Sequence, residues 1–146
     1  MTYSLMEYRT ARHFIGTLGM DSDLIGSVAA AAQQAEVAAA QLTVWGTLIK
    51  AVMGCFDPAQ MVYVTWVEDR PMELVNGSGI LCMKDEEPFV RLHGLVADDR
   101  GNCRGGRLFP GTVAFSIEYV LREWTEPPPT RRYDPATGLQ RLVPIR

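Results

Sequence analysis

The side chains best suited to chemistry in this sequence lie in one segment, residues 88–111, PFVRLHGLVADDRGNCRGGRLFPG. Arg91 and His93 are two residues apart in a strand-like run, so both side chains point to the same face of a strand. Arg104 and Arg107 follow in a glycine-rich stretch that we expect to be a turn between strands. Guanidinium and imidazole groups gathered in this way favour a site for a carboxylate or phosphate anion.

Other interpretations of this segment stay open. Arg91 and His93 can lie on a solvent-exposed strand face, or Arg91 can pair with Glu118, which lies in the next apolar run. A metal site is the weakest interpretation, because His93 would be a single ligand and arginine stays protonated. The alternative that makes the protein an enzyme has His93 as general acid or base, with the arginines holding a small anionic substrate.

Length and composition set the class of protein. A chain of 146 residues, 47% of them hydrophobic, fits one domain with a substantial core. The net charge of −3 argues against a broad basic surface for nucleic acid. There is no apolar run of membrane-spanning length and no signal-peptide pattern, so we expect a cytoplasmic protein that does not contact a membrane. Three cysteines without a C-x-x-C pair predict neither a disulfide framework nor a zinc site, but small core residues: Cys55, Cys82 and Cys103.

The pattern along the chain predicts an α+β fold. Residues 8–18 are typical of a first strand, and residues 23–41 of one long helix with Asp21 or Ser22 as its N-cap. The apolar positions of this helix recur at helical spacing, at Leu24, Val28, Ala32 and Ala35. Short β-branched and aromatic runs separated by turn signals follow, at residues 42–56, 61–67, 72–83, 88–97 and 112–121. We expect an antiparallel sheet of six or seven strands with one main helix packed on it.

Two further segments carry predictions about packing. The run 112–121 is apolar on both faces, with one face formed by Val113, Phe115, Ile117, Tyr119 and Leu121. We therefore expect a cover on each side, the helix on one and a neighbouring subunit as a candidate on the other. Residues 125–146 are rich in proline and have no sustained period, which predicts an extended arm after a domain at residues 1–124. A disordered tail is the alternative, although the apolar side chains in this segment favour packing on the same or another chain: Tyr133, Leu139, Leu142, Val143 and Ile145.

These motifs together resemble the PPC domain (plant and prokaryote conserved domain) from about Tyr8 to Trp124. The most specific elements are PF-x-RLH, the acidic turn that follows it, GGRL-x-x-G and the closing strand with Glu118. The resemblance implies a compact α+β fold and a homotrimer. It also implies a binding or regulatory module, since stand-alone prokaryotic members mostly lack an assigned activity and many are labelled DNA-binding through the relationship alone.

The sequence departs from this family at its metal site. Many prokaryotic members carry three histidines that together hold zinc, and the matching positions here are Arg91, His93 and Arg107. The resemblance therefore implies that the metal site is lost, and we expect no cofactor. Our hypothesis is a metal-free cationic pocket between subunits for a small anion, lined by these three residues and Glu118. In the alternative, the site has decayed and Arg91 or Arg107 pairs with Glu118 within the trimer.

The DNA-binding element of the plant relatives has no counterpart in this sequence. Those proteins carry an AT-hook with an Arg-Gly-Arg-Pro core, which is absent from these 146 residues. Together with the net charge of −3, this leads us to expect only weak binding to DNA.

Overall fold

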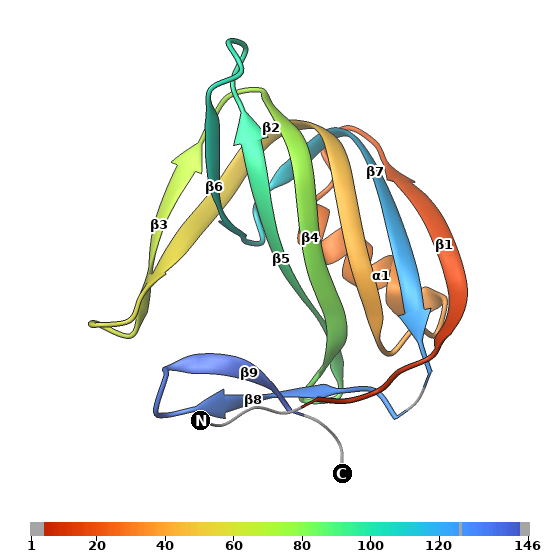
Figure 1. The fold of residues 1–146 in the computed structure, drawn as a ribbon. Coiled ribbons are helices and arrows are strands. Elements are labelled where there is room, and N and C mark those ends of the chain that lie inside the picture. Colours follow the sequence, from red (N-terminus) through yellow and green to blue (C-terminus); the bar gives the residue numbers. More distant parts are fainter. Residues whose placement is uncertain (1–4, 126, 144–146) are drawn as a thin grey trace.

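The computed structural model describes residues 5–125 and 127–143 and confirms the α+β class (Figure 1). One sheet contains nine strands, and one helix, α1 (Leu24–Gln34), packs on it. The strands are β1 (Thr10–Leu18), β2 (Ala40–Asp57), β3 (Val62–Glu68), β4 (Met72–Lys84), β5 (Glu87–Ala97), β6 (Cys103–Leu108), β7 (Val113–Trp124), β8 (Thr130–Asp134) and β9 (Leu139–Val143). The prediction of six or seven strands was too low, because β6 lies in the expected glycine-rich turn and β8 and β9 lie in the expected arm.

The strand β2 organises the sheet because it is long enough to pair with four neighbours. Its first half pairs with β4 and β7, and its second half pairs with β3 and β6. The strands β4, β5 and β6 are joined in turn by antiparallel pairing. The pairing therefore closes into a circuit of β2, β4, β5 and β6, which curves the sheet strongly (Figure 1).

The helix begins at Leu24, after a five-residue connection from β1, and is shorter than predicted. Its N-cap is Asp23, whose Oδ1 accepts a hydrogen bond from Gly26 N at 2.7 Å, so the expectation of Asp21 or Ser22 was wrong. The alanine-rich segment after Gln34 is not helical, because Glu36 has a φ of +56° and Ala40 already pairs with the neighbouring strands. Sheet pairing overrides the helical propensity of alanine here.

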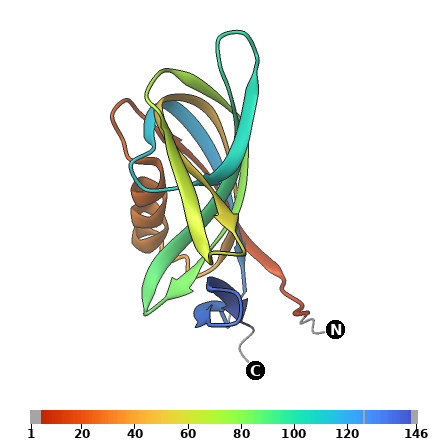
Figure 2. The same cartoon turned by 90° about the vertical axis from the view of Figure 1, so that its left-hand side faces the viewer.

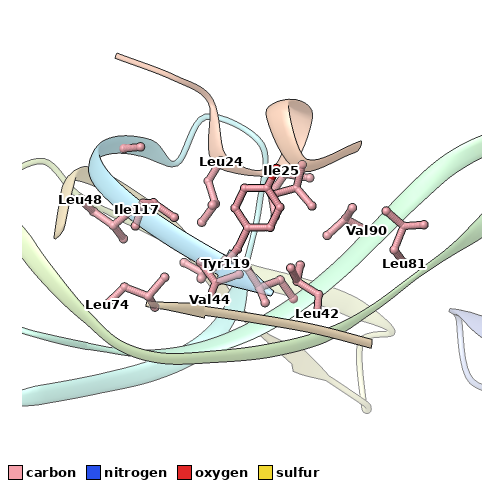
Figure 3. Close-up of a cluster of buried hydrophobic side chains, with 14 of the residues drawn as sticks. Leu24, Ile25, Leu42, Val44, Leu48, Leu74, Leu81, Val90, Ile117 and Tyr119 are labelled. Atoms are coloured by element: carbon pink, nitrogen blue, oxygen red, sulfur yellow. The ribbon is translucent and has the colours of Figure 1, made fainter. Parts of the chain in front are cut away.

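The core lies between α1 and the inner face of the sheet (Figures 2 and 3). Leu24 and Val28 of the helix are fully buried against sheet residues such as Leu42 and Val44. On β5, Val90 and Leu92 belong to this core. Because side chains alternate along a strand, the residues between and after them point to the opposite, outward face of the sheet.

The face pattern of β7 is partly as predicted. Ile117, Tyr119 and Leu121 lie in the core, but Phe115 is 48% exposed and Ala114 is fully buried. The register of β2 against β7 shifts between Thr47 and Leu48, and such an irregularity reverses the faces on its far side.

The segment after Trp124 forms a hairpin on the same chain, with β8 paired to β9. Met83 of β4 pairs with Thr130 in the only parallel contact among the described strands. Figure 1 shows the hairpin across the end of the sheet where β4 runs into β5. Tyr133 is 61% exposed, and Ile145 lies outside the described residues. Leu139, Leu142 and Val143 are half-buried, and Arg131 is buried, so both apolar and charged side chains of the segment pack on the same chain.

The helix α1 is too short to span a membrane. It has 11 residues, and the described part of the chain contains no helix with the length and apolar character needed to cross a bilayer.

Candidate functional site

An open pocket of about 620 Å³ lies on the outward face of the sheet, and residues of β2, β4, β5, the end of β7 and β8 line it. Its polar lining comes from Gln41, Ser78, Arg91, His93 and Arg131. Ile80 and Trp124 add apolar surface. The structure thus brings two of the sequence-predicted residues together, Arg91 and His93, and adds a third cation that the sequence analysis did not single out.

Strand register explains why Arg91 and His93 share this pocket. Arg91 pairs with Ile80 and His93 pairs with Ser78 on β4. These residues alternate with core residues of β5, so all of them point outward. Both faces of β5 are therefore used, one for the core and one for the pocket.

Arg91 is held by neutral oxygens. Its Nη1 donates to the carbonyl oxygen of Gln140 on β9 at 3.2 Å, and its Nη2 donates to the hydroxyl of Tyr63 at 3.1 Å. Glu118 is not its partner within the chain, because Glu118 Oε2 accepts from Trp45 Nε1 at 2.8 Å. The structure therefore does not bring Glu118 into the pocket of its own chain.

Arg107 lies beside His93 in strand register but does not line the pocket. Its guanidinium carbon is 4.7 Å from the centre of the Phe109 ring and 5.0 Å from that of Tyr63. Such distances are typical of cation–π contacts. The buried Nε of Arg107 has no hydrogen-bond partner within residues 5–125 and 127–143. Arg107 contributes positive charge next to the pocket rather than a group inside it.

Arg131 is the site residue that sequence reasoning missed. It lies on β8, is only 8% exposed, and its Nη1 donates to Gln140 O at 3.1 Å. Its guanidinium carbon is 5.6 Å from the centre of the Phe89 ring. The only signal in the sequence is the pair Arg131–Arg132, and nothing in it tells which of the two faces the sheet.

The basic side chains of the site shift one another's pKa values. His93 is exposed on β5, yet its pKa is lowered by the loss of hydration in the pocket and then by Arg91, Arg107 and Arg131, which favours the neutral imidazole at pH 7. Burial is also the main cause that lowers the pKa of Arg131. Cys82 acts in the opposite direction through charge and a hydrogen bond, and Arg91 and Arg107 lower the pKa further. At neutral pH the charge of the pocket therefore comes from its guanidinium groups.

No carboxylate in the described part of the chain neutralises these arginines. The ion pairs found there join Arg12 to Glu123, Arg70 and Arg104 to Glu68, and Arg141 to Asp134. Arg104 of the predicted cationic segment is thus tied to Glu68 at 2.8 Å, away from the pocket. Arg91, Arg107 and Arg131 form no ion pair with any described residue.

The three cysteines differ in burial. Cys82 is buried, but Cys55 and Cys103 are exposed, so the prediction of three core cysteines was wrong for two of them. Cys55 lies near the end of β2 and Cys103 at the start of β6, and at both positions the side chain is outside the core. Across residues 5–125 and 127–143, His, Cys, Asp and Glu side chains form no group of three or more that could hold a metal ion.

Comparison with known proteins identifies the family. The model of the Plants and Prokaryotes Conserved (PCC) domain, which is the PPC domain named above, matches residues 6–125. The chain therefore belongs to the PCC domain family. In this member the domain consists of a nine-stranded sheet with one helix packed on it. No curated protein matches the sequence significantly.

Solved structures share the fold over nearly the whole chain. A metal-containing protein from Archaeoglobus fulgidus is 27% identical, with a TM-score of 0.92 over 97% of this chain and 100% of that one. A plant- and prokaryote-conserved protein from Pyrococcus horikoshii is 21% identical, with a TM-score of 0.90 over 99% of both chains. A proposed DNA-binding protein from Bacteroides thetaiotaomicron is 18% identical, with a TM-score of 0.84 over 93% of this chain and 96% of that one.

Proposed function

We propose that this chain is a binding or regulatory module without catalysis of its own, which assembles as a homotrimer and holds a small anion in a metal-free cationic pocket. Arg91 and His93 line the pocket, and Arg107 adds charge beside it. The observation that carries the proposal is that Arg91, Arg107 and Arg131 gather with no described carboxylate among them.

The physical argument is one of charge compensation. Positive side chains that are partly removed from water are stable only when hydrogen bonds and opposite charge offset the loss of hydration. Gln140 O and the Tyr63 hydroxyl supply hydrogen bonds to Arg91 but no negative charge. A bound carboxylate or phosphate supplies both, and arginine recognises such groups through paired N–H donors.

The homotrimer is the second part of the proposal. It is supported by the family resemblance and by apolar side chains exposed on the sheet, including Ile15 at 84%, Leu95 at 48% and Trp45 at 37%. In such an assembly Glu118 would reach a pocket only from a neighbouring subunit. Light scattering on the purified protein should give three times the mass of one chain, and a monomer at all concentrations would contradict the assembly.

Association with DNA is the weakest part of the proposal. It is supported by the proposed DNA-binding protein among the structural relatives. The net charge of −3 limits the phosphate contacts that nonspecific binding requires. A local cluster of arginines fits one small anion better than a nucleic-acid backbone.

Isothermal titration calorimetry with phosphate, citrate and related carboxylates tests the anion pocket. We expect saturable binding at pH 7.5, with one site per chain. An absence of heat even at millimolar ligand would end the proposal, whatever the oligomeric state.

A further inference from the structure

We infer that the ligand is a dianionic oxyanion with an organic body, of the phosphate monoester class, and that Arg131 on β8 supplies the second of the two charges that bind it. This inference rests on the proposed anion pocket and adds to it the class of ligand and the role of the C-terminal hairpin. It is carried by four features of the pocket.

The first feature is the state of Arg131 itself. The side chain is 8% exposed and lines the pocket, and it donates to Gln140 O at 3.1 Å. Its other side-chain hydrogen-bond partner among the described residues is the buried thiol of Cys82, so its five N–H donors meet no carboxylate. Its buried Nε has no hydrogen-bond partner there. A buried guanidinium with free donors and no counter-charge is a group prepared for an anion.

The second feature is the position of Arg131 relative to Arg91. Both side chains donate to the same carbonyl oxygen, that of Gln140, so their guanidinium groups lie next to each other. Two like charges at this separation repel, and this repulsion contributes to lowering the pKa of Arg131. An oxyanion with two negative charges neutralises both groups, whereas a monoanion leaves one charge uncompensated.

The third feature is that the pocket holds two charges at neutral pH. His93 is the third basic side chain of the pocket, and its lowered pKa favours the neutral imidazole at neutral pH. The guanidinium of Arg107 stacks on Phe109 and Tyr63 outside the pocket. The charge to be matched is therefore that of Arg91 and Arg131.

The fourth feature is the size and the lining of the pocket. A volume of about 620 Å³ is far larger than a bare inorganic anion needs. Ile80 and Trp124 provide an apolar and aromatic surface, and Gln41 and Ser78 provide uncharged hydrogen-bonding groups. These groups suit an organic body attached to the oxyanion.

Two matched probes separate charge from shape. Phenyl phosphate and phenyl sulfate carry the same ring and the same bridging ester oxygen on a tetrahedral oxyanion, but at pH 7.5 phenyl phosphate is mainly a dianion and phenyl sulfate is a monoanion. Calorimetry on the wild-type protein should show phenyl phosphate binding about tenfold tighter. In Arg131→Gln this preference should fall to about twofold or less, through lost affinity for phenyl phosphate.

Arg132→Gln is the matched control, because Arg132 follows Arg131 on β8 and is exposed. It removes the same charge from the same strand and should keep the preference of the wild type. If Arg131→Gln fails to fold by circular dichroism, Arg131→Lys serves instead, since it keeps the charge without the planar fork. It should retain the preference for phenyl phosphate at reduced affinity.

The outcomes distinguish this inference from the proposed function. Equal wild-type affinity for the two probes, or identical behaviour of Arg131→Gln and Arg132→Gln, would overturn the dianion inference while the anion pocket stands. Loss of the preference in a folded Arg131→Lys would overturn it as well. If wild-type protein binds neither these probes nor phosphate, the proposed function itself fails.

Discussion

Replacing Gly46 with alanine is expected to destabilise the protein by roughly 3 kcal/mol or more. Gly46 has a φ of +132°, which side chains rarely adopt, and an added Cβ would lie 2.3 Å from the carbonyl oxygen of Ser116. That oxygen belongs to the backbone of β7, the neighbouring strand, and cannot move aside without disturbing the pairing. The pairing of β2 with β4 has a register shift between Val44 and Gly46, so Gly46 lies at an irregularity of the central strand.

Urea denaturation measures this effect, and Gly19→Ala provides the control. A Cβ at Gly19 would meet nothing within 4 Å, so this substitution should change the free energy of unfolding by about 0.5 kcal/mol or less. Equal stability of the two variants would show that β2 and β7 do not approach each other as described.

Replacing Arg91 with glutamine is expected to weaken phosphate binding by about 30-fold or more, which corresponds to about 2 kcal/mol. Arg91 lines the pocket from β5 and is half-buried, and its neighbour Arg131 would then face the anion alone. The substitution should leave the fold intact, because the glutamine side chain can remain on the outward face of the strand. Calorimetry with wild-type and variant protein measures the change.

Arg100→Gln is the control for this prediction. Arg100 is exposed in the turn of residues 98–102, where its backbone N–H donates to Asp98 Oδ1, and it lies outside the pocket. Its removal lowers the net charge by the same amount and should change phosphate affinity by less than about twofold. A similar loss in both variants would mean that the anion responds to overall charge and not to a site.

The elements with clear apolar alternation were predictable from the sequence. The run 88–97 alternates around Val90 and Leu92, and from this pattern alone Arg91 and His93 could be placed on one face of a strand. The strand β6 could not be found in the same way. Its sequence CRGGRL lacks apolar alternation and contains two glycines, and only pairing with β5 and β2 makes it a strand.

Tertiary pairing also explains the remaining differences. The alanine run up to Ala40 favours helix locally, but Ala40 pairs with Leu81 and Glu123 on two neighbouring strands. The segment TRRYD of β8 has no apolar pattern, so the burial of Arg131 against Phe89 could not be inferred from it. Arg107 was expected in the pocket because the sequence does not show which aromatic residues lie near it. In the structure its guanidinium packs on the rings of Tyr63, Phe89 and Phe109, beside the pocket.

The nuclear magnetic resonance titration of His93 tests the anion pocket most directly. The chain has two histidines, and a His13→Gln variant assigns the signals. In the free protein we expect the pKa of His93 below its ordinary value of 6.5, because of the loss of hydration in the pocket and the nearby arginines. Saturating sulfate, whose charge is constant in this range, should raise that pKa, since a bound anion offsets Arg91 and Arg131. By linkage, sulfate should then bind more tightly as the pH falls toward this pKa. A His93 pKa that is the same with and without sulfate would contradict an anion site at this imidazole.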